Sequence, residues 1–233
     1  MPMKLCTLVL TLLAGGCGLI SSDVTNFDLT LPDKNFSVDA ASWEITDAEA
    51  QPLLSTSCAG NPTICGSAAQ AACPMNCDGD CSASTQTCDL TLAISLYQNV
   101  DLLAEKPELQ QINDEPVIKV TIDSVTWEVT ANTLNVDTPQ MTVYVAPMSA
   151  MDPSSPDARA IGTISAIEAG GVTDAPQQLA FTATGKADLV STMSAFKTPF
   201  NLIVGSTITI GQGQSVPQGK LDAVVHIKAH AGL

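Results

Sequence analysis

Eight cysteines carry the clearest chemistry in this chain, and six of them fall within one short segment. These are Cys58, Cys65, Cys73, Cys77, Cys81 and Cys88. They span 31 residues, and no cysteine occurs in the last 145 residues. The segment around them is rich in Ser, Ala, Gly and Pro, so it has little apolar surface to bury and needs covalent links instead. An even, clustered set predicts three disulfides, although six cysteines allow about 15 pairings and the sequence does not choose among them.

A metal site built from the same cysteines is the rival interpretation. On a helix, Cys73, Cys77 and Cys81 would present three thiols on one face, where zinc or an iron–sulfur cluster could bind. The C-x2-C spacing of zinc knuckles is absent. An oxidising compartment also favours disulfides over thiolate ligands.

A calcium site is a second alternative in this segment. The oxygen ligands would come from Asn76, Asp78 and Asp80. The spacing and the downstream Glu of an EF-hand loop are missing. Because Asn, Asp and Gly are turn formers, a tight turn is the preferred interpretation, and we predict no metal site.

The two histidines are His226 and His230, and both fall in the last predicted strand. Four residues of strand separate them by about 13 Å, so they lie on one face but cannot bind one ion together. The sequence has no G-x-S-x-G, H-E-x-x-H or P-loop motif. Its nine aromatic residues are few for a sugar-binding glycosidase cleft. We therefore predict no catalytic residues, no cofactor and no enzymatic activity.

The N-terminus has the organisation of an export signal. A short basic start precedes an apolar run over residues 5–14, which is too short to span a bilayer. The run ends in Leu-Ala-Gly-Gly-Cys17, which resembles the lipobox of bacterial lipoproteins, with Ala14 where Leu is usual. The resemblance implies that residues 1–16 are cleaved, that Cys17 is lipidated, and that Gly18 directs the protein to the outer membrane. The alternative is an ordinary secreted protein cleaved nearby.

Composition restricts the remaining classes. The chain has 233 residues, a formal charge of −15 and 45% hydrophobic residues. This hydrophobicity argues against intrinsic disorder, and no later apolar run approaches the length of a membrane-spanning helix. The single Arg and eight scattered Lys form no basic patch for nucleic acid, which we exclude as a partner.

Beyond the cysteines, the pattern is that of antiparallel sheet. Short runs rich in Thr, Val and Ile alternate with turn residues and predict nine strands. The predicted strands cover residues 26–31, 36–46, 87–98, 117–130, 140–146, 161–167, 178–184, 200–210 and 220–230. One helix is predicted over 186–196, where Leu189, Met193 and Phe196 recur at helical spacing, and a second short helix is considered over 102–110. The second half resembles, in pattern, the small sandwich domains of desiccation-related proteins.

Two segments of the chain echo one another. Residues 36–46 align with 120–130, with Asp, Trp, Glu and Thr identical, and they contain both tryptophans of the protein. We interpret them as two equivalent sandwich strands that each bury a Trp. A repeated ligand platform on the surface is the alternative.

These observations predict a mainly β protein, an antiparallel β-sandwich with one short helix and a disulfide-rich loop insertion. The expected organisation is a signal peptide (1–16), a lipidated tether (17–25) and a single sandwich domain (26–233) with the Cys-rich insertion at about 52–89. The expected function is that of a non-enzymatic structural or binding module of the cell envelope, held at the outer membrane by its lipid. Its partner would be an unidentified envelope protein or ligand. Alternatives are a carrier that holds an apolar ligand between its sheets and a calcium-dependent adhesion module.

Overall fold

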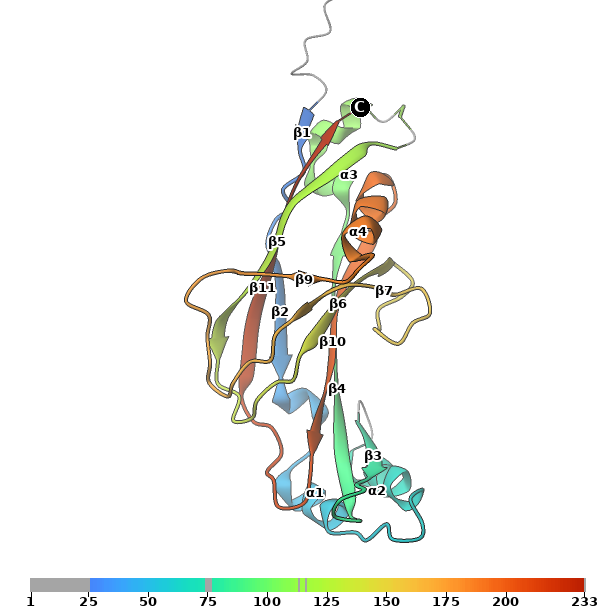
Figure 1. The fold of residues 1–233 in the computed structure, drawn as a ribbon, viewed down its shortest axis with the longest axis vertical. Helices are drawn as coiled ribbons and strands as arrows, with labels where there is room; N and C mark the ends of the chain where they lie inside the picture. The colour runs from blue at the N-terminus through green and yellow to red at the C-terminus, as the bar shows by residue number, and fades with distance from the viewer. Residues whose placement is uncertain (1–25, 74–76, 113, 116, 233) are drawn as a thin grey trace, which may run out of the picture.

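Two antiparallel sheets packed face to face form the body of the protein (Figure 1). The computed structural model describes residues 26–73, 77–112, 114–115 and 117–232. The first sheet contains β1 (Asn26–Asp28), β2 (Lys34–Asp39), β5 (Lys119–Asn132), β8 (Gln177–Gln178) and β11 (Lys220–Gly232). The second contains β3 (Cys77–Cys81), β4 (Cys88–Val100), β6 (Met141–Pro147), β7 (Arg159–Ile164), β9 (Ala180–Phe181) and β10 (Phe200–Ile210). The predicted antiparallel, mainly β fold is confirmed.

Long strands with alternating side chains supply the core. β11 pairs with β5 along its length, and its other edge pairs in turn with β2 and β1. In the second sheet β10 pairs with β4 over Phe200 to Ile210. Leu221, Val225 and Ile227 of β11 are buried between the sheets, as the predicted alternation requires.

The space between the two sheets is filled. An apolar cavity between the sheets has a volume of about 10 Å³. The cavity is lined by Phe36, Val38, Leu96, Met141, Ile164, Val204, Leu221, Ala223 and Val225. A void of this size is at the lower limit for one water molecule, so the two sheets interdigitate at the density of an ordinary protein core.

The predicted helix of the second half is present as α4 (Gly185–Ser194). Its residues Leu189 and Met193, with Phe196 just beyond, are buried against the sandwich. The segment over 102–110 forms α3 (Leu102–Glu105) followed by the 3-10 helix η3 (Pro107–Ile112). Pro107 separates these two pieces because it lacks the amide proton that a continuous helix requires.

The strand predicted over residues 36–46 is wrong in its second half. β2 ends at Asp39, whose carboxylate accepts a hydrogen bond from the Ala41 amide and caps the 3-10 helix η2 (Ala40–Trp43). Glu44 then adopts a left-handed backbone conformation with φ of 51°. Trp43 therefore leaves the strand, and its Nε1 donates to the carbonyl of Ala93. Both tryptophans are buried as predicted, but only Trp127 lies on a strand.

Two further predictions need correction. The predicted strand over 178–184 is two short strands, β8 and β9, which belong to different sheets because the chain crosses between them at Leu179. The cysteine-rich insertion is not a plain loop, since it contains α1 (Asp47–Leu54), α2 (Ile64–Ala72) and β3. Its Ala-rich stretch after Cys65 supports helix formation, because alanine loses little entropy in a helix.

A buried ion pair joins the two sheets near β1. Lys34, at the start of β2, is 7% exposed, and its Nζ lies 2.7 Å from Glu105 Oε1 on α3. The Asp101 amide also donates to this oxygen. The other oxygen, Oε2, is buried with no hydrogen-bond partner among the described residues. Glu105 therefore depends on Lys34 for compensation of its charge.

We expect Lys34→Met to lower the free energy of unfolding by about 3 kcal/mol, because Glu105 is left as a largely buried carboxylate without its cation. The double variant Lys34→Met/Glu105→Leu should recover most of this loss, since it removes both charges and keeps the volume. Urea denaturation of the three proteins measures the difference. A double variant as unstable as the single one would show that packing, rather than charge, sets the effect.

Candidate functional site

The six clustered cysteines form three disulfides, as predicted. Cys58 pairs with Cys81, Cys65 with Cys88, and Cys73 with Cys77. All six sulfurs are thereby used, which displaces the alternative of a zinc or iron–sulfur site. The pairing could not be predicted because it depends on how α2 lies across β3 and β4.

The disulfides build one end of the molecule, which we call the cystine tip and define as the described residues 44–73 and 77–92. Two bonds link α2 and the segment before it to the β3–β4 hairpin, and the third closes the connection from α2 to β3. The helix lies directly on the hairpin: a Cβ at Gly79 would meet the Cys65 carbonyl oxygen at 2.2 Å. Only glycine permits this approach, so the tip packs backbone against helix without large side chains.

α1 is fixed at its start by a capping box. The Thr46 hydroxyl accepts from the Glu49 amide, and Glu49 Oε2 accepts from the Thr46 amide at 2.8 Å. Hydrogen bonds from the Thr46 hydroxyl and amide lower the pKa of Glu49 below its ordinary value. The helix is also tied to the β10–β11 loop, where the Val216 amide donates to Asp47 Oδ1 at 2.8 Å.

A groove of about 350 Å³ runs between α1 and α2. Its lining is mostly small and apolar and consists of Glu49, Pro52, Leu53, Thr56, Ala68, Ala71 and Ala72. The Thr56 hydroxyl is used internally, because it donates to the Pro52 carbonyl. Ile64, 38% exposed at the start of α2, lies on the same helical side as Ala68 and Ala71. The groove is thus an apolar surface that continues along α2.

Two of the three calcium candidates lie on the exposed side of β3. Asp78 and Asp80 are exposed, and Asp80 stands directly opposite Asp89 of β4. Asn76 lies outside the described residues. Within the part of the chain that the structure describes, no group of three or more His, Cys, Asp or Glu side chains is placed to hold a metal ion.

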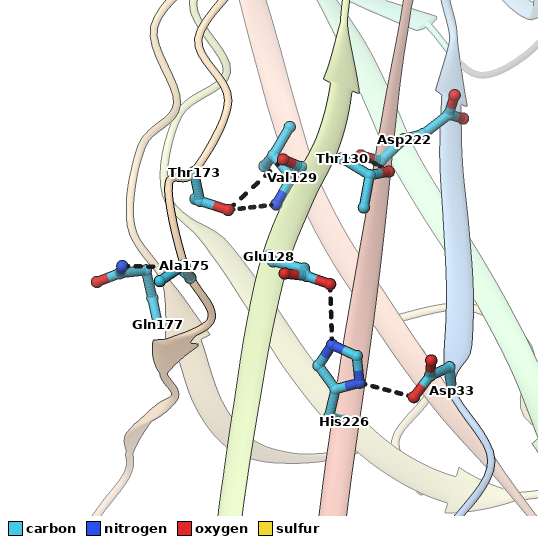
Figure 2. A network of polar contacts seen from close by, with 9 residues as sticks. All are labelled: Asp33, Glu128, Val129, Thr130, Thr173, Ala175, Gln177, Asp222 and His226. Carbon is cyan, nitrogen blue, oxygen red and sulfur yellow. Dashed lines mark hydrogen bonds and ion pairs between the residues drawn. The ribbon is translucent and has the colours of Figure 1, made fainter.

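His226 lies on the outer face of the first sheet between two carboxylates (Figure 2). Its Nδ1 is 2.7 Å from Asp33 Oδ1, in the segment just before β2, and its Nε2 is 3.3 Å from Glu128 Oε1 on β5. The ring donates to both only when it is protonated, and to one in either neutral tautomer. The two nitrogens face opposite sides, so imidazole and carboxylates do not converge on one point. The alternation of β5 could have placed Glu128 on this face, but the pairing register was needed to set it beside His226.

This network ties strands together and contains no activated nucleophile. The nearby Thr173 hydroxyl accepts from the Val129 amide at 3.0 Å, and the Thr130 hydroxyl donates to the Asp222 carbonyl (Figure 2). Both hydroxyls therefore bond to backbone rather than to the imidazole. His230 is paired separately, with Nδ1 3.0 Å from Asp123 Oδ1. The arrangement is that of an outer polar face whose side-chain hydrogen bonds join β11, β5 and the segment before β2.

Comparison with known protein families, curated proteins and solved structures finds no match to this chain. Every helix in the described residues is too short or too polar to cross a membrane.

The disulfides that close long and short loops should differ in their contribution to stability. Removing the Cys65–Cys88 bond as Cys65→Ala/Cys88→Ala should cost about 3 kcal/mol, and removing Cys73–Cys77 in the same way about 2 kcal/mol. The reason is loop entropy, since the first bond closes a separation of 23 residues and the second a separation of 4. Urea denaturation followed by tryptophan fluorescence gives both values. The reverse order would mean that packing at the tip outweighs loop closure.

The capping box predicts a pH dependence. Since the pKa of Glu49 is lowered in the folded state, its stabilising effect is present above the ordinary value of 4.5 and is lost as the pH falls through the lowered folded value. Glu49→Gln keeps a capping side chain but removes this titration. We expect the melting temperature of the variant to fall less than that of the wild type between about pH 6 and pH 3. An equal fall in the melting temperatures of the two proteins over this pH range would contradict the assignment.

Proposed function

We propose that this protein is a lipid-anchored, non-enzymatic binding module of the bacterial cell envelope that presents its cystine tip away from the membrane. The proposed anchor is Cys17, and the outer membrane is the proposed location. The lipobox-like sequence before Cys17 supports the anchor, and the three disulfides are compatible with an oxidising compartment.

One observation carries the proposal: β1 and the cystine tip lie at opposite ends of an elongated sandwich (Figure 1). β4 begins in the tip with Cys88 and leads into α3 (Leu102–Glu105), which lies toward the β1 end of the molecule (Figure 1). Thirteen residues of strand correspond to about 40 Å. An anchor upstream of β1 would therefore join the sandwich at the end opposite the tip.

The interior supports a binding module over an apolar-ligand carrier. A carrier that holds a ligand between the sheets needs a cavity of about 300 Å³ or more. The apolar cavity found between the sheets has only about 10 Å³. The surface groove of the tip, by contrast, is open to a partner without any rearrangement of the core.

Intact mass spectrometry of the detergent-extracted protein tests the anchor. We expect a chain that starts at Cys17, carries added acyl mass, and gains about six hydrogens when three disulfides are reduced. Cys17→Ser should leave the protein unacylated and release it from the membrane fraction. Cys6→Ala is the matched control, because Cys6 lies in the segment that is cleaved. An unacylated wild-type chain would refute the lipid anchor.

A further inference from the structure

The cystine tip carries acidic side chains and no basic ones. Residues 35–105 contain nine acidic residues and no Lys, Arg or His. Six of the acids belong to the tip, namely Glu44, Asp47, Glu49, Asp78, Asp80 and Asp89. The described ion pairs of this stretch use Asp39, with Lys220, and Glu105, with Lys34, and both acids lie outside the tip. The tip therefore carries a negative field with no internal counter-charge.

Two acidic residues of the tip occupy directly opposite positions on neighbouring strands. Asp80 of β3 and Asp89 of β4 are direct cross-strand partners, an arrangement that destabilises a sheet. Next to them in the same hairpin, Cys81 and Cys88 are also cross-strand neighbours. They are not bonded to each other, since Cys81 forms a disulfide with Cys58 and Cys88 forms one with Cys65. The covalent links allow the tip to keep a charge distribution that a non-crosslinked hairpin would resist.

The groove between α1 and α2 is preorganised within this field. Cys65, in α2, is bonded to β4, and Cys58, after α1, is bonded to β3. α1 is held from the other side by Asp47 and by Gln51, whose Nε2 donates to the Gln214 carbonyl at 3.1 Å. A partner that enters the groove would not have to order its walls, which lowers the entropic cost of binding.

We infer that the groove between α1 and α2 binds a basic segment of a partner protein, with small apolar side chains in the groove and Lys or Arg residues against the surrounding acids. The apolar lining of Pro52, Leu53, Ala68 and Ala71 selects for side chains rather than for a bare cation. Glu49 in the lining and the other acids of the tip repel phosphate and anionic lipid headgroups. This inference deepens the proposed function by naming the partner's chemistry, but the groove itself does not depend on the anchor.

Fluorescence anisotropy with defined peptides tests the inference on the full-length, detergent-extracted protein. The probe is a labelled 12-residue peptide in which Lys alternates with Leu and Ala. One comparison peptide has Glu in place of every Lys, and another has Ser in place of every Leu and Ala. We expect the probe to bind at least about tenfold more tightly than either comparison peptide, since it alone satisfies both the charge and the groove. Its affinity should fall as salt is raised.

A matched pair of variants locates the site. Ala71→Arg places bulk and positive charge in the groove at an exposed helical position, where Arg is well tolerated. We expect it to weaken probe binding by about tenfold or more, at an unchanged melting temperature. Ala187→Arg makes the same change at an exposed position of α4, outside the tip, and should alter binding by less than about twofold.

Three results would overturn the inference. Equal weakening by Ala71→Arg and Ala187→Arg would mean that the probe responds to overall charge and not to the groove. A Ser-substituted peptide that binds as tightly as the probe would remove the role of the apolar lining. Spermine that displaces the probe at equal concentration would identify a simple polycation site. Because the assay needs no acyl group, its failure is separate from failure of the lipid anchor.

Discussion

Burial of apolar faces between two antiparallel sheets is the constraint on which the other features depend. β4, β5, β10 and β11 are long strands whose inward side chains fill the space between the sheets almost completely. Such close packing makes the body of the sandwich rigid, and the two ends of the sandwich lie outside this core. The two ends are accordingly built by different means, β1 by continuation of a sheet and the cystine tip by crosslinks.

The tip compensates for a core that its sequence cannot provide. Residues between α1 and β4 are mostly small, and Gly79 brings backbone within contact of α2 rather than a large side chain. Three disulfides replace the missing burial and tolerate the acidic pair Asp80 and Asp89. The disulfides therefore keep the tip rigid even though it has little apolar surface to bury and its acidic side chains repel one another.

The ion pairs of the described residues lie outside the tip, which sets the tip apart. Lys34 pairs with Glu105 near the β1 end, Lys220 and Asp39 join β11 to β2, and the carboxylates of Asp33 and Glu128 flank His226 on the outer sheet face. The chain has few bases, and those of the described structure lie outside residues 35–105. Uneven placement of a small number of cations is therefore enough to give the two ends of the sandwich different electrostatic character.

The amino-acid sequence by itself determined the features that depend on local pattern. Alternation in β11 gave its buried face, the spacing of Leu189, Met193 and Phe196 gave α4, and the clustered cysteines gave three disulfides. The burial of both tryptophans followed from their size. These features are readable because periodicity and composition act over a few neighbouring residues.

Features that join distant segments were decided only by the tertiary structure. The echo around Trp43 and Trp127 has nearly the same local pattern in both copies, yet one copy is a strand and the other leaves its strand for η2, because Asp39 caps that helix and Trp43 bonds to Ala93. The disulfide pairing, the carboxylate partners of His226 and the groove between α1 and α2 depend on register and on packing between segments. Strand register and packing between segments are not encoded in any short window of sequence, because contacts with the rest of the chain override local preference.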